Sequence, residues 1–139
     1  MRVLLDINIL LDVILEREPW HHAAARLLSW IDEGRLHGFV ASHTLPTIHY
    51  VVTRARDRGI ATTAVSDLLR VVDVVPVEKD DLHHALVLPV EDFEDAIQLA
   101  SGLRIGADYI VTRNEKDFRA GSIPPIEADR LMAVLRAER

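Results

Sequence analysis

Residues 3–15 read VLLDINILLDVIL, and an acid at position 6 divides this apolar stretch into two parts. Val3, Leu4 and Leu5 form a short, wholly apolar run, which is typical of a buried strand in a parallel sheet. Residues 7–15 have the character of a helix, so the predicted strand ends at Asp6. The stretch therefore predicts a strand that passes directly into a helix, with a carboxylate at the junction.

Strands and helices alternate along the rest of the chain. Further strands are predicted at residues 38–41, 71–77 and 108–112, with a short extended piece at 123–126. Helices are predicted at 24–31, 45–55, 62–69, 81–88, 93–103 and 127–135, with Gly59 ending the helix at 45–55. This alternation predicts one α/β domain over residues 1–139, with a parallel sheet and right-handed crossovers.

Composition narrows the class of protein. Hydrophobic residues make up 49% of the 139 residues and aromatic residues only 5%, so we expect a globular core of aliphatic side chains. The chain has no cysteine, which excludes disulfides and thiolate metal sites. Residues 1–15 make a poor signal peptide, and no apolar stretch is long enough to span a bilayer. We therefore expect a cytoplasmic protein without a membrane partner.

The net charge of -6 does not by itself indicate a nucleic-acid-binding protein. Arg113, Lys116 and Arg119 nevertheless form a local basic group. It is either an ordinary solvated helix end, which is the simpler interpretation, or a rim that grips phosphate.

Acidic side chains are predicted to meet at one edge of the sheet. Ligands of open parallel sheets bind at the carboxyl ends of the strands, where Asp6 ends the first strand and Thr112 the fourth. The helix that feeds the fourth strand must begin on the same edge, which brings in Asp92 and Asp95. The expected set is Asp6, Asp92, Asp95, Asn114 and Asp117, with Ser42, Thr44 and Thr47 at the head of the helix after the second strand.

Carboxylates packed without a counter-charge raise one another's pKa and cost stability, and a divalent cation removes that repulsion. An all-oxygen set with room for water suits Mg²⁺ or Mn²⁺. Such ions position phosphate esters and activate water, so the pattern indicates metal-assisted phosphodiester hydrolysis.

Four segments, in this order, resemble the PIN-domain ribonucleases and in particular the VapC-type toxins of bacterial toxin–antitoxin pairs. They are residues 3–15, ASHTLPTIHYVV at 41–52, FEDAIQLASGLRIGADYIVTRNEKDF at 93–118 and IPPIEADRL at 123–131. The resemblance implies a five-stranded parallel sheet sandwiched by helices and an endoribonuclease that uses Mg²⁺ or Mn²⁺ and metal-activated water. It also implies a homodimer and a cognate antitoxin protein.

The resemblance assigns roles to individual residues. Asp6, Asp95 and Asp117 match catalytic acids, and the same three with Asp92 are the predicted metal ligands. Supporting roles fall to Asn8, Thr47, Thr112 and Asn114, and Arg113 and Lys116 are candidates for contacting the RNA substrate. Asn8 is expected to hydrogen-bond a ligating carboxylate.

Simpler interpretations compete at several positions. Asp6 and Asp92 are natural helix N-caps, and the side chains of Asn114 and Asp117 can satisfy backbone groups in a turn. The adjacent pairs His21–His22 and His83–His84 are expected to point apart and not to chelate a metal together. Trp20 and Trp30, on the face of residues 7–31, could line a groove for an antitoxin helix, although core or dimer contacts are the simpler reading.

Two positions depart from the family pattern. A glutamate is expected where Thr47 stands, and many relatives have an aspartate where this chain has Asn114. These losses motivate an alternative, a catalytically weak PIN-like module that acts by binding an antitoxin, RNA or both. A third hypothesis is a nuclease with the same metal chemistry that acts on DNA.

Overall fold

A five-stranded, all-parallel sheet forms the centre of the computed structural model, which describes residues 1–138. The strands are β1 (Arg2–Leu5), β2 (His37–Ala41), β3 (Asp73–Val75), β4 (Tyr109–Val111) and β5 (Pro125–Ile126), in the order β3-β2-β1-β4-β5. The chain therefore builds one half of the sheet outward from β1 and then returns to build the other half from β4. The predicted α/β fold with five parallel strands is confirmed.

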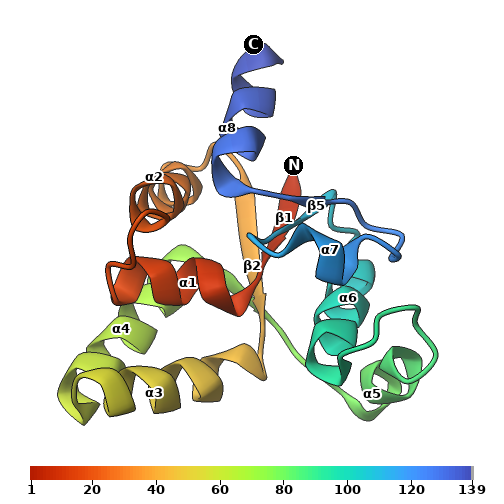
Figure 1. Ribbon diagram of the computed structural model, residues 1–139, viewed down its shortest axis with the longest axis horizontal. Coiled ribbons are helices and arrows are strands. Elements are labelled where there is room, and N and C mark those ends of the chain that lie inside the picture. The colour runs from red at the N-terminus through yellow and green to blue at the C-terminus, as the bar shows by residue number, and fades with distance from the viewer. Residues whose placement is uncertain (139) are drawn as a thin grey trace.

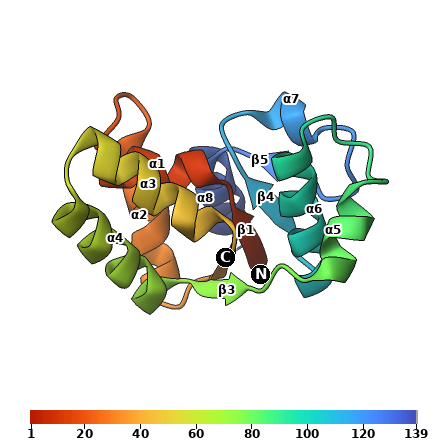
Figure 2. The ribbon, with the colours of Figure 1, turned by 90° about the horizontal axis from the view of Figure 1, so that it is seen from below.

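Helices cover both faces of the sheet (Figure 1, Figure 2). One face packs against α1 (Ile7–Ile14), α2 (His21–Asp32), α3 (Thr44–Ala55), α4 (Arg58–Val71) and α8 (Ala128–Ala137). The other packs against α5 (Lys79–Ala85), α6 (Phe93–Ile105) and α7 (Glu115–Phe118). Val3 and Leu5 enter the first core and Leu4 the second, because successive strand residues point to opposite faces.

Local signals explain how α6 begins and ends. Its N-cap is Asp92, whose carboxylate accepts a hydrogen bond from the Asp95 N–H at 3.0 Å. It ends at Gly106, whose φ of 63° lies in the left-handed region that glycine adopts without strain. This turn sends the chain back into β4, next to β1.

Several details of the predicted elements were wrong. Gly59 lies inside α4, because Asp57 begins that helix by accepting a hydrogen bond from the Ile60 N–H at 2.8 Å. The predicted strand 71–77 is only Asp73–Val75, since α4 continues to Val71. The short helix α7 was not predicted.

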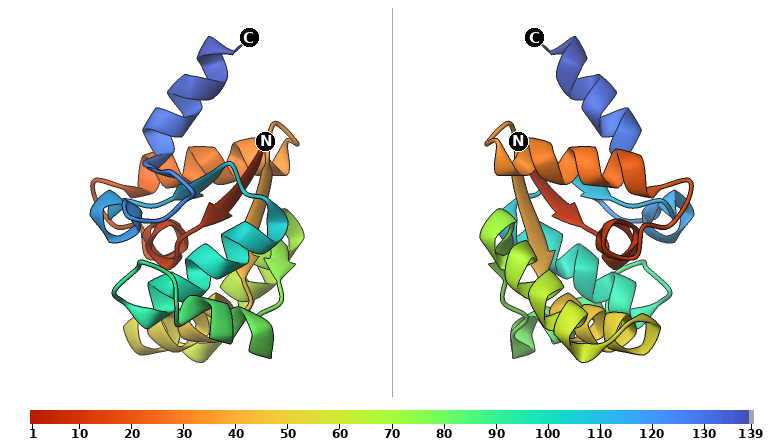
Figure 3. Two further views of the ribbon diagram at one scale, coloured as in Figure 1. Left: turned by 90° about the vertical axis from the view of Figure 1, so that its right-hand side faces the viewer. Right: turned by 90° about the vertical axis from the view of Figure 1, so that its left-hand side faces the viewer.

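The last helix extends away from the body of the molecule (Figure 3). Leu131 and Met132, in its first half, are buried in the core, so this end anchors the helix. No helix among residues 1–138 is long and apolar enough to cross a membrane.

Candidate active site

Asp6 lies where the sheet reverses its strand order. In open α/β sheets, this switch point at the carboxyl ends of the strands is the usual place for a ligand. The backbone N–H of Asp6 donates to the Val111 carbonyl at 3.0 Å, which fixes the residue beside β4. Its carboxylate accepts hydrogen bonds from the Ile7 N–H at 2.8 Å and from the Thr112 hydroxyl at 2.9 Å. Asp6 therefore both caps α1 and joins β1 to β4.

The electrostatic environment of Asp6 does not favour a bare carboxylate. Only 4% of the residue is exposed, and this burial raises the pKa of its carboxyl group. The hydrogen bonds from Thr112 and Ile7 act in the opposite direction, whereas the charge of Asp117 raises the pKa further. A cation at this position would favour the ionised form.

Asp95 is the second acid at this edge and lies in the first turn of α6. Burial, and then the charges of Asp92, Asp6, Asp117 and Glu94, raise its pKa to about 7. Acids from the end of β1, from α7 and from the head of α6 thus act on one carboxyl group. Asp6, Asp92 and Asp117 of the predicted set thus lie within range of the charge of Asp95.

Asp95 separates two hollows of different size. A recess of about 20 Å³ is lined by Asp6, Thr47, Asp95 and Gln98 among others, and has room for about one water molecule or ion. A cleft of about 590 Å³ is lined by Asp92, Asp95, Lys116 and Asp117 among others. The residues that line the cleft come mainly from α7 and from the loop before α6. These two segments lie at the same edge of the molecule (Figure 2).

The recess contains a residue that the sequence analysis missed. Gln98 is 3% exposed, its amide nitrogen donates to the Thr44 hydroxyl at 3.3 Å, and its Oε1 has no hydrogen-bond partner among the described residues. Gln98 lies three positions after Asp95, on the same side of α6. That spacing was the available signal, since a polar side chain there must share the surroundings of Asp95.

His43 also lines the recess. Burial lowers the pKa of its imidazole, against the opposing effect of Glu94. The ring is therefore favoured in its neutral form, and it adds no positive charge to balance the acids.

The donors fit a hard divalent cation. They are carboxylate, amide and hydroxyl oxygens, the ligand types of Mg²⁺ and Mn²⁺. Within residues 1–138, no three of these acids have ligand atoms within 4.8 Å of one another. The set is thus open rather than a closed cage, which suits an ion that keeps several of its waters.

Comparison with known proteins identifies the family. A PIN-domain family model matches residues 2–116. The chain belongs to the PIN-domain family. It is 21% identical, over 127 residues, to ribonuclease VapC1 of Aquifex aeolicus, an alignment that covers 88% of this chain and 87% of that protein.

Two solved structures share the PIN fold with this chain. VapBC2 of Rickettsia felis, bound to a DNA fragment from its promoter, matches with a TM-score of 0.74 and 15% identity, over 91% of this chain and 98% of that one. VapC20 of Mycobacterium tuberculosis, a sarcin–ricin loop cleaving toxin, matches with a TM-score of 0.72 and 21% identity, over 90% and 98% of the two chains. The chain therefore resembles VapC-type PIN domains over nearly its whole length.

Of the residues predicted to support the acids, Thr112 and Thr47 contact the site and Asn114 lies at the start of α7. Thr112 is fully buried, and its hydroxyl both donates to Asp6 and accepts from the Asn114 N–H at 3.0 Å. Thr47 lines the recess and donates to the His43 carbonyl at 3.4 Å, so α3 contributes a hydroxyl there. Asn114 precedes α7 without a side-chain capping bond.

The predicted contact of Asn8 with a carboxylate was wrong. Its side-chain oxygen instead accepts a hydrogen bond from Arg17 at 3.5 Å. Asn8 is the second residue of α1, and Arg17 lies in the loop that follows this helix.

Arg113 has a structural partner that the sequence analysis missed. Its guanidinium donates to both carboxylate oxygens of Asp12, at 2.9 and 3.3 Å, and Asp12 is fully buried. The ring of Trp20 covers the guanidinium at 3.9 Å. Lys116, in contrast, is exposed and lines the cleft. Contact of either residue with RNA stays a prediction.

Proposed function

We propose that this PIN domain is a Mg²⁺- or Mn²⁺-dependent endoribonuclease of the VapC toxin type. The observation that carries the proposal is the recess that Asp6 and Asp95 line together, with Asp92 and Asp117 on the adjoining cleft; burial and these neighbouring acids raise the pKa of Asp95 to about 7. A divalent cation relieves their repulsion and favours the ionised form of each carboxylate. RNA as the substrate is supported by the likeness to a ribonuclease and to a sarcin–ricin loop cleaving toxin.

In this proposal Asp6 and Asp95 hold the ion, and Asp92 and Asp117 support it from the side of the cleft. When bound, the ion supplies the charge that orients a phosphodiester and lowers the pKa of water. Thr112 orients the Asp6 carboxylate through its hydroxyl. The cleft of about 590 Å³ is large enough for a nucleotide, and Lys116 on its lining offers an ammonium group to an RNA phosphate.

Cleavage of single-stranded RNA, structured RNA and DNA in Mg²⁺ or Mn²⁺ tests the function. We expect RNA cleavage, and we expect EDTA to abolish it. Asp6→Asn and Asp95→Asn should each reduce the cleavage rate at least about a hundredfold, because each removes a charged ligand of the ion. Asp80→Asn, an exposed change on α5 that lines neither the recess nor the cleft, is the matched control. RNA cleavage by Asp6→Asn at the wild-type rate would show that the site is assigned wrongly. Cleavage of DNA but not of RNA would show that the substrate is DNA.

The presence of Thr47 on α3 supports the alternative, a PIN module that binds partners but cleaves weakly. It lines the recess with a hydroxyl where the family pattern has a carboxylate. Calorimetric titration with Mn²⁺ separates the two functions. Binding at millimolar Mn²⁺ supports the nuclease, and its absence from a folded protein supports the binding module.

We also propose a cognate antitoxin as the protein partner, since solved structures of similar fold are VapBC complexes. An apolar groove of about 500 Å³ between α1, α2 and α4 has the shape for an amphipathic antitoxin helix. Ile14, Leu28 and Ile60 line this groove, whereas Trp30 is buried in the core and Trp20 covers Arg113. Ile60→Asp should release the proposed cognate antitoxin in a pull-down experiment while RNA cleavage continues.

A homodimer is part of the same proposal and rests on the family resemblance. Sedimentation velocity of the purified chain measures its mass directly. A species of 15.6 kDa at all concentrations would exclude the dimer.

A further inference from the structure

Glu18, His21 and His22 form a compact cluster outside the acidic site. Each offers one ligand atom, and these atoms all lie within 4.8 Å of one another. None of the three lines the recess or the cleft. Within residues 1–138 this is the only group of three or more histidine and acidic side chains with that spacing.

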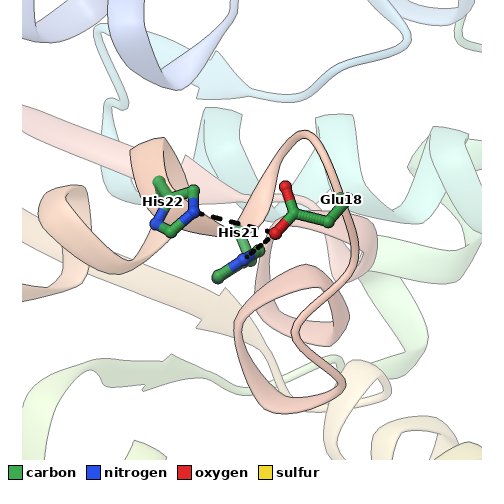
Figure 4. A group of neighbouring side chains, drawn as sticks. All are labelled: Glu18, His21 and His22. Carbon is green, nitrogen blue, oxygen red and sulfur yellow. Dashed lines mark hydrogen bonds and ion pairs between the residues drawn. The ribbon is translucent and has the colours of Figure 1, made fainter.

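The expectation that His21 and His22 point apart was wrong. Their ring centroids are 3.9 Å apart. Helical side chains lean toward the N-terminus of their helix, and these two residues begin α2. Both rings therefore reach back to the loop before α2, where Glu18 lies (Figure 4).

One carboxylate oxygen of Glu18 contacts both rings. Its Oε1 lies 2.7 Å from Nε2 of His21 and 3.7 Å from Nε2 of His22 (Figure 4). Ligands bound at about 2.0–2.2 Å to a tetrahedral Zn²⁺ are separated by roughly 3.3 Å. The two observed distances lie on either side of that value, so small rotations bring the atoms to coordinating positions.

The exposure of Glu18 and His22 allows these rotations. The side chains of Glu18 and His22 are each 71% exposed, whereas that of His21 is 18% exposed. His21 is thus a fixed anchor, and the other two ligands are free to adjust around it.

We propose that Glu18, His21 and His22 bind Zn²⁺ or a similar transition-metal ion. Two imidazoles and one carboxylate are an established ligand set for zinc, which leaves a fourth position for water. Imidazole nitrogen favours Zn²⁺, Ni²⁺ and Cu²⁺ over Mg²⁺. The two sites of this chain therefore differ in chemistry, since the proposed ligands of the acidic site are carboxylates.

The position of this site suggests what a bound ion does. Trp20 lies between Glu18 and His21 in the chain and covers Arg113 at 3.9 Å. An ion held by residues on both sides of Trp20 restrains the loop between α1 and α2. The bound ion therefore steadies the indole over the ion pair of Arg113 with Asp12.

Calorimetric titration with ZnCl₂ in an Asp95→Asn background tests the site separately from the proposed nuclease. We expect one Zn²⁺ per chain, and Glu18→Gln or His22→Ala should each weaken binding by more than about tenfold, the loss typical of even an indirect metal contact. The double variant His83→Ala/His84→Ala is the matched control. It removes two exposed, adjacent histidines from α5. This double change should leave the affinity for Zn²⁺ unchanged.

Two results would overturn this inference. One is Zn²⁺ binding that Glu18→Gln and His22→Ala leave unchanged, and the other is an equal loss in the α5 control. The visible spectrum of bound Co²⁺ gives a second readout, because histidine ligation in four-coordinate geometry intensifies its bands. The single variant His22→Ala, with Asp95 intact, should still bind Mn²⁺ at the acidic site. Loss of Zn²⁺ binding alone therefore concerns the histidine site, and loss of Mn²⁺ binding alone concerns the acidic site.

Discussion

At the scale of single residues, Asp95 is the most informative side chain of this PIN domain. Its pKa is raised from 3.8 to about 7, first by burial and then by neighbouring acids. Between those two pH values the folded, metal-free protein holds a proton that the unfolded chain has released. Asp95 therefore reduces the stability of the metal-free fold progressively as the pH rises from about 4 to about 7.

Asp95→Asn should consequently stabilise the metal-free protein at pH 8. We expect a gain on the order of 1 kcal/mol, discounted from the full linkage value because the side chain is partly solvated. Thermal melts in EDTA from pH 5 to pH 8 measure it, and the difference from wild type should shrink toward acid pH. Asp80→Asn, an exposed change on α5 whose charge does not act on Asp95, is the control. A variant that melts below wild type at pH 8 would contradict the repulsion argument.

Thr47 permits a second prediction at this scale. Thr47→Glu adds a carboxylate on the recess, so Mn²⁺ should bind about tenfold more tightly, because affinity for hard cations follows ligand charge. Thr47→Gln has the same size without the charge and should leave the affinity near that of wild type. Calorimetry with Mn²⁺ compares the three proteins. Equal affinities for the Glu and Gln variants would place Thr47 outside the reach of the ion.

Some site residues were predictable from sequence and others were not. Asp6 and Asp95 follow from a buried strand that ends in an acid and from a helix that must begin on the same edge. Asp12 could not be paired with Arg113, because the two are 101 positions apart and no local pattern links them. Gln98 was missed because an amide inside an apolar helical pattern resembles core packing until its unpaired oxygen is seen.

At the scale of elements, the turn after β4 is held by an ion pair rather than by its own hydrogen bonds alone. Arg113 follows β4 in the chain, and its guanidinium donates two hydrogen bonds to the carboxylate of Asp12 on α1. The Asp12 side chain is fully buried. The same turn carries Thr112, Asn114 and the start of α7. The position of α7, a helix of four residues, thus depends on contacts that periodicity cannot reveal.

Arg113→Ala should destabilise the protein by about 3 kcal/mol, because it leaves the Asp12 carboxylate buried without its closest partner. Arg119→Ala, an exposed arginine in the same segment, should change stability by less than about 0.5 kcal/mol. Urea denaturation followed by circular dichroism measures both. Similar midpoints for the two variants would show that Arg17, 3.8 Å from Asp12, suffices as its partner.

At the scale of the whole molecule, an acidic protein is proposed to bind an acidic polymer. The net charge is -6, so the overall field opposes RNA, and binding must rest on the ion and on a few local cations. The chain has two lysines, Lys79 on α5 and Lys116 on the lining of the cleft. Few phosphate contacts imply a shallow dependence of affinity on salt.

The lysines provide a matched pair for this last prediction. If Lys116 contacts one phosphate, Lys116→Ala should reduce the slope of log affinity against log salt by about 0.7, the value for one contact on a single strand. Lys79→Ala removes the same charge from another part of the surface and should leave the slope unchanged. Fluorescence anisotropy of labelled RNA, between about 50 and 200 mM KCl in an Asp6→Asn background, gives both slopes. Equal changes of slope in the two variants would mean that RNA affinity depends only on the net charge of the protein, and that Lys116 does not contact a phosphate.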